Sequence, residues 1–86
     1  MLETEIQSSL FWEYTVGEKV LGEVESIIDL KEPCEELRQD GFPVKVRLVQ
    51  ILTKECLGNV REWKEYGNWC PWVEFRMAHR TMLFGG

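Results

Sequence analysis

The three cysteines and the single histidine of this 86-residue sequence are its candidate metal ligands. A structural zinc site takes four nitrogen or sulfur ligands, usually with Cys-x-x-Cys pairs that place two thiolates on one turn. No such pair occurs, so a site would need one ligand from each of four segments: Cys34, Cys56, Cys70 and His79. Free cysteines commonly pack as small apolar side chains. The spacing therefore favours three packed thiols and no metal site, with a small metal-binding protein as an alternative.

Nucleophilic catalysis would require Cys70 to act with His79, because no other histidine is present. Cys70 stands between Trp69 and Pro71, an apolar setting that raises the pKa of a thiol and lowers its reactivity. An odd number of cysteines gives no disulfide framework. The sequence also lacks a phosphate-binding loop, a dinucleotide fingerprint and a nucleophile elbow. We therefore expect no catalytic residue and no cofactor.

Three carboxylates in the first part of the chain form another candidate group. Glu13, Glu23 and Glu25 should fall on one face of two neighbouring strands. Such a group could hold a divalent cation, but in a chain with fifteen acids it more often forms a solvated surface. We interpret these residues as an acidic strand face that sets partner choice through charge.

Charge is distributed unevenly along the chain, which carries a net charge of −5. Residues 1–36 contain ten acids and two bases, whereas residues 37–86 contain five acids and eight bases. One interpretation is that the two halves interleave in the fold and neutralise each other across neighbouring strands. The other is that the fold has separate acidic and basic faces that steer a partner.

The basic and aromatic second half suggests single-stranded nucleic acid as one class of partner. Such binders combine a cationic groove with aromatic platforms on which bases stack. The cationic residues available are Lys45, Arg47, Arg61, Lys64, Arg76 and Arg80. Lys45 and Arg47 should share one strand face and Arg76 and Arg80 another, which would form a stripe if the strands were neighbours. The acidic chain opposes nonspecific affinity, because that affinity rests on counterion release by excess base. Nucleic-acid binding on an OB-like face is therefore the alternative.

The segment YGNWCPWVEF (66–75) favours a protein partner instead. Trp, Tyr and Arg dominate the hot spots of protein–protein interfaces. Trp69 and Trp72, three residues apart, cannot both point into one core from a regular strand, so one of them should face water. We predict a docking surface beside the acidic face, made of Trp63, Tyr66, Trp69 and Trp72. The partner would be another protein or a second copy of this chain.

Short alternating segments must position these residues. Period-two alternation predicts strands over 10–16, 20–30, 42–53, 60–66 and 71–84. Turns are predicted at Gly17-Glu18, Leu57-Gly58-Asn59 and Gly67-Asn68. Gly22, inside the second strand, indicates a bend or bulge. Pro33 near its start and Gly41 just past its end predict a short helix over 33–40.

The pattern predicts one mainly β domain over residues 1–86, with residues 1–8 as a flexible N-terminal arm. Five antiparallel strands would form a small barrel or half-open sheet, OB-like or SH3-like, and an α+β sheet is the alternative. No apolar run approaches the roughly 20 residues that span a membrane, and the acidic N-terminus does not match a signal peptide. We expect a cytoplasmic, non-catalytic binding module without a membrane partner.

Overall fold

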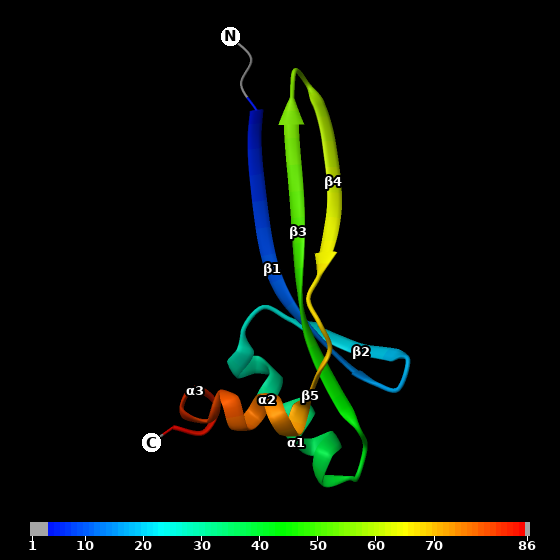
Figure 1. The fold of residues 1–86 in the computed structure, drawn as a ribbon, viewed down its shortest axis with the longest axis vertical. Coiled ribbons are helices and arrows are strands. Elements are labelled where there is room, and N and C mark those ends of the chain that lie inside the picture. The colour runs from blue at the N-terminus through cyan, green and yellow to red at the C-terminus, as the bar shows by residue number, and fades with distance from the viewer. Residues whose placement is uncertain (1–3, 86) are drawn as a thin grey trace.

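The computed structural model describes residues 4–85, which form one open antiparallel sheet with helices packed against it (Figure 1). The strands are β1 (Thr4–Val16), β2 (Lys19–Val24), β3 (Val44–Cys56), β4 (Asn59–Tyr66) and β5 (Cys70–Pro71). Their order is β2-β1-β3-β4, and the short β5 pairs with β3 beyond the end of β4. Within residues 4–85 the two outer strands do not pair with each other, so the sheet is not a closed barrel. The prediction of a mainly β, half-open sheet is confirmed.

β1 and β3 form the central pair of the sheet. They run antiparallel over their full length, from Thr4 opposite Cys56 to Val16 opposite Val44. Side chains of a strand alternate between faces, and residues opposite each other share a face. Trp12, Tyr14 and Val16 therefore lie on the face that carries Val44 and Val46, as their alternation predicted.

Four short helical segments lie at one end of the sheet. Between β2 and β3 the chain forms η1 (Ile27–Leu30) and α1 (Lys31–Gln39), and after β5 it forms α2 (Trp72–Ala78) and α3 (Arg80–Phe84). Ser26 begins η1, because its Oγ accepts a hydrogen bond from the Ile28 amide at 3.3 Å. Pro33 lies in the first turn of α1, and Gly41 follows its end with φ of 88°. The helix predicted over 33–40 is therefore confirmed, with a start two residues earlier.

The core lies between these helices and the adjoining part of the sheet. Its buried members are Leu30, Cys34, Val44, Val46, Trp72, Phe75 and Leu83. Trp12 packs its ring edge against Phe75, with 5.2 Å between ring centroids. Each fully buried large apolar side chain contributes about 1.5–3 kcal/mol, so the stability of the protein is concentrated at this end.

β1, β3 and β4 continue beyond the helices as a narrow arm, which we define as residues 4–11 and 49–66 (Figure 1). Every residue of β4 is exposed. The radius of gyration is 16.2 Å and the molecule measures 55 × 32 × 17 Å. A compact chain of this length would have a radius of gyration of about 12 Å. The arm accounts for the difference.

Gly22 marks a bulge between β1 and β2, as predicted. Tyr14 pairs with Gly22 but Thr15 pairs with Val20, which leaves Leu21 as the extra residue. The ring of Tyr14 lies on Gly22, and a Cβ there would be 2.6 Å from Tyr14 Cζ. Glycine is therefore required because the tyrosine occupies the space of its side chain.

The predicted strand over 71–84 is wrong, since this segment forms α2 and α3 after the two residues of β5. Trp72 and Phe75, three residues apart, both face the core, whereas Val73 and Met77 are exposed. Val73, Phe75 and Met77 alternate as in a strand, but Trp72 and Phe75 also fit the i, i+3 spacing of one helix face. Burial of Trp72 decides in favour of the helix.

Two smaller predictions also need correction. Thr4–Ser8 belong to β1 and pair with residues 52–56 of β3, so they are not a flexible arm; residues 1–3 lie outside the described residues. The second strand ends at Val24, where η1 replaces its predicted continuation to Leu30.

Gly67-Asn68 is not a turn, because β4 and β5 both pair with β3 in the same direction. Tyr66 lies opposite Val49 and Cys70 opposite Val46, so the outer strand has one residue more than β3 between these pairs. The segment is therefore a bulge in one long edge strand.

Candidate binding surface

Arg47 lies on the face of the sheet opposite to the core. Its guanidinium carbon is 4.2 Å from the ring centroid of Tyr66 and 4.1 Å from that of Trp69. Its Nε donates a hydrogen bond to Glu13 Oε1 at 2.8 Å. We call Glu13, Arg47, Tyr66 and Trp69 the Arg47 cluster. Because the cation is held by both rings and by a carboxylate, the two exposed aromatic rings are fixed in place.

The backbone explains how these four residues meet. Glu13 and Arg47 are opposite each other in the β1–β3 pair. The bulge at 67–69 places Trp69 on the face that holds Tyr66, and the Gly67 amide anchors it by donating to the Leu48 carbonyl at 2.8 Å. The sequence predicted the residue types of this cluster, but it contained no signal for the pairing of Arg47 with two rings.

The predicted acidic face is present in part. Glu23 lies opposite Glu13 on this face, and Glu25 follows the end of β2. Glu13 is only 8% exposed and is paired with Arg47, so its charge is offset. Glu23 and Glu25 are exposed. They border a shallow groove whose other lining residues are Ser9, Leu10, Phe11, Val24, Ile51 and Lys64.

The four predicted docking aromatics do not form one surface. Trp72 is 1% exposed and belongs to the core, so it is not a docking residue. Trp69 is 37% exposed, which answers which of the two tryptophans faces water. Tyr66 and Trp69 lie together in the Arg47 cluster. Trp63 pairs with Leu52, so it lies on the other face of the arm.

The predicted cationic stripe does not form. Lys45 and Arg47 share a face as expected, and Lys64, opposite Ile51, lies on the same face. Arg61 lies on the other face of the arm, opposite Lys54. Arg76 and Arg80 are on α2 and α3 and not on a strand, and Arg76 binds Glu35. The pairs Glu13–Arg47 and Glu35–Arg76 join the acidic and basic halves of the chain. In the sheet, however, β2 and β1 lie together on one side and β3 and β4 on the other, so the two halves meet at the β1–β3 pair and their strands do not interleave.

The candidate metal ligands and nucleophile have other surroundings. No three His, Cys, Asp or Glu side chains within residues 4–85 are grouped to hold a metal ion. Burial, helped by the charge of Glu35, raises the pKa of Cys34 to about 12. Burial and the nearby charge of Glu74 also raise the pKa of Cys70, as predicted from its apolar setting. His79 stacks on Phe75 with 4.1 Å between ring centroids.

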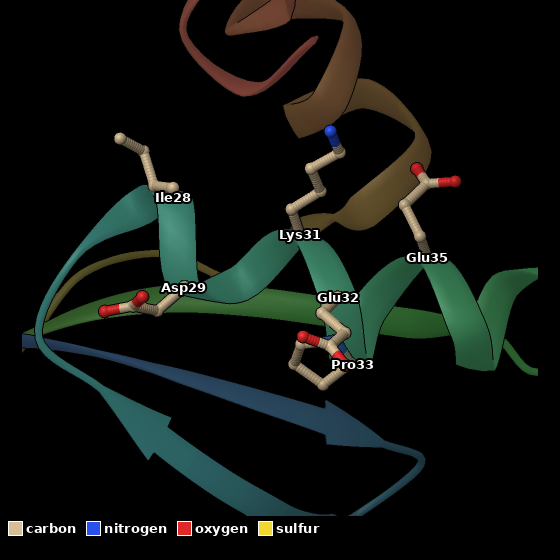
Figure 2. A pocket seen from close by; sticks show the side chains of 6 residues that line it. All are labelled: Ile28, Asp29, Lys31, Glu32, Pro33 and Glu35. Atoms are coloured by element: carbon tan, nitrogen blue, oxygen red, sulfur yellow. The ribbon is translucent and has the colours of Figure 1, made fainter.

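A shallow pocket lies along η1 and α1, and Figure 2 shows the six residues that line it. Lys31 and Glu35 point toward the C-terminal helices, whereas Glu32 and Pro33 lie on another side of α1 (Figure 2). Burial opposes ionisation of Glu35, but hydrogen bonds from Arg38, Arg76 and Trp72 outweigh it and lower the pKa of the carboxyl. Because these partners already occupy the carboxylate, we do not treat this pocket as a ligand site.

Sequence reasoning missed the apolar surface of the arm. One face of the arm carries Ile6, Leu10, Leu52 and Trp63. Leu52 shares the face of β3 that carries Val46, and the other three residues lie opposite β3 residues of that face. Ile6 is 61% exposed, Leu10 52% and Trp63 36%. The sequence pattern placed Leu10 on the same strand face as Trp12. Nothing in the pattern indicated that the helices end before reaching this part of the sheet.

Comparison with protein-family models, with curated proteins and with solved structures found no match. Within residues 4–85, no helix is both long and apolar enough to cross a membrane.

Proposed function

We propose that this protein is a non-catalytic binding module that docks another protein chain through its arm. The observation that carries the proposal is a three-stranded arm whose apolar residues have no covering layer among the described residues. The Arg47 cluster, with Glu23 and Glu25 nearby, lies at the base of the arm and adds aromatic and acidic contacts.

The size of the exposed surface supports this function. The accessible surface is 6323 Å². A compact monomer of 10.2 kDa would expose about 5300 Å². The excess is similar to the roughly 800 Å² that each partner buries in a standard protein–protein interface. Covering one face of the arm would therefore bring the exposed surface close to that of a compact protein.

The chemistry of the arm favours protein over nucleic acid. Its acids and bases nearly balance: Glu5, Glu55, Glu62 and Glu65 against Lys54, Arg61 and Lys64. Counterion release from nucleic acid requires an excess of base, whereas an interface core takes exposed aliphatic and aromatic side chains such as Leu10 and Trp63.

Affinity capture with matched variants tests the proposal. Leu10→Glu with Trp63→Glu places two charges on the apolar face of the arm, one of them on β4. Val73→Glu with Met77→Glu places two charges on exposed positions of α2. Tagged wild type and both variants would be captured from source cells with and without nuclease, after circular dichroism has verified their folding. The bound proteins would be quantified by mass spectrometry, including an untagged copy of the chain itself.

We expect the wild type and the α2 variant to retain a protein in near-stoichiometric amount and the arm variant to lose it. Equal capture by all three proteins, loss of the bound protein after nuclease treatment, or no protein above background would each overturn the proposal.

A further inference from the structure

The outer edge of β4 is free of any strand within residues 4–85. In an antiparallel pair, alternate residues point their backbone groups toward the partner strand. The Gly67 amide donates to the Leu48 carbonyl of β3, so the odd-numbered residues of this edge point inward. The N–H and C=O groups of Val60, Glu62, Lys64 and Tyr66 therefore point away from the sheet, and an exposed edge of this kind is a template for another strand.

The side chains of β4 select one antiparallel register with a second β4. Two-fold pairing places the central residue opposite its own copy, and a centre at Arg61, Glu62, Lys64 or Glu65 would oppose like charges. A centre at Trp63 gives a different result. It opposes Trp63 to Trp63, Glu62 to Lys64, Arg61 to Glu65 and Val60 to Tyr66. Every pair in that register is aromatic, aromatic with β-branched, or of opposite charge, which are the pairs that stabilise sheets.

The surroundings of Trp63 suit this two-fold axis. When the two-fold axis passes through an odd-numbered residue, that residue and its copy form a non-hydrogen-bonded pair. Opposing side chains come closest in pairs of this kind. Trp63 lies beside Leu52 and is 36% exposed, so two copies would join their apolar faces into one stripe. Its Nε1 donates to Glu65 Oε1 at 3.3 Å, which places that carboxylate beside the axis and near Arg61 of the second copy.

We propose that the protein docks a second copy of itself by antiparallel pairing of β4 with β4, centred on Trp63. The inference rests on the proposed function and names the partner of the arm. The two sheets then form one continuous sheet, in which the exposed edge of each copy is covered by the other.

Charge exchange at positions 62 and 64 tests both the partner and the register. In this register position 62 of each copy lies opposite position 64 of the other. Glu62→Lys therefore places lysine opposite lysine on both sides of the axis, and Lys64→Glu places glutamate opposite glutamate. Both residues are exposed and face Thr53 and Ile51 within the chain, so the fold should not change. By sedimentation equilibrium we expect a dimer for the wild type and a dissociation constant raised at least about tenfold for each single variant.

Two restorations make the test specific. The double variant Glu62→Lys with Lys64→Glu recovers all opposite-charge pairs, so it should dimerise like the wild type. The two single variants, mixed in equal amounts, should form a heterodimer because each supplies the charges that the other lacks. The second-copy inference is overturned if the charge exchanges leave the dissociation constant of the dimer unchanged. It is also overturned if the wild-type chain stays monomeric. In the monomeric case, capture of a different protein through the arm leaves the proposed function standing, so the two failures are distinguishable.

Discussion

The indole Nε1 of Trp72 donates a hydrogen bond to Glu35 Oε1 across 3.1 Å, which joins α2 to α1. The same carboxylate accepts hydrogen bonds from Arg38 and Arg76. The polar end of a buried tryptophan is thereby satisfied, and the helices are held against each other at the core.

Replacing Trp72 should therefore destabilise the fold far more than replacing Trp69. We expect Trp72→Ala to lower the free energy of unfolding by about 3–5 kcal/mol, because it opens a cavity and leaves Glu35 without one donor. Trp69→Ala removes an exposed ring from Arg47 and should cost about 1 kcal/mol. Urea unfolding followed by circular dichroism measures both, and equal losses would contradict the assignment of Trp72 to the core.

Acid should weaken the protein through Glu35. Its pKa in the folded state lies below the ordinary value of 4.5, so its contribution to stability is complete above that pH. The contribution is lost as the pH falls through the lower pKa of the folded state. Glu35→Gln should flatten the dependence of unfolding free energy on pH below 4.5. The exposed Glu32→Gln on the same helix is the control, and a steep acid dependence that survives Glu35→Gln would argue against this role.

The thiols should differ in reactivity. Cys34 is fully buried and its pKa is raised to about 12, so it should resist iodoacetamide at pH 8 until the protein is unfolded. Cys70, whose pKa is also raised, should react more slowly than a free cysteine. Peptide mapping after timed alkylation, with and without urea, measures each site. Rapid labelling of Cys34 in the native protein would contradict its burial.

The tip of the arm can be stabilised at Leu57. This residue has φ of 53° in the turn between β3 and β4, a conformation that costs an L-residue roughly 1–2 kcal/mol. Asparagine tolerates it, so Leu57→Asn should raise the free energy of unfolding by about 0.5–1 kcal/mol. Leu57→Val, which is β-branched, should lower it. Hydrogen exchange of the β4 amides reports the local effect, and the opposite order of the two variants would exclude the positive-φ turn.

Much of the sheet could be predicted because its alternation is long. Over 10–16, 44–53 and 60–66 the pattern was confirmed, and so was the turn at Leu57-Gly58. The segment after Pro71 was misread because Val73, Phe75 and Met77 alternate over too few residues to exclude a helix. Only the tertiary contact of Trp72 with the core distinguishes the two.

The candidate site was less predictable because it depends on pairing between distant segments. Strand alternation placed Glu13 and Arg47 on faces of their own strands, but their contact depends on the register of β1 against β3. One extra residue at 67–69 decides on which face Trp69 lies, and no local pattern counts that residue. The exposure of Leu10 likewise depends on where the helices end.

The full-length pairing of β1 with β3 also governs how the chain is made. Thr4 must find Cys56, so the start of the first strand is synthesised roughly 3–10 s before its partner. The β3–β4 hairpin, in contrast, closes within about 1–10 μs once its residues are free. Residues 4–11 of β1, which pair with β3 and not with β2, therefore lack their partner throughout this interval. We expect the late pairing of β1 with β3 to compete with association of its exposed apolar residues with other nascent chains.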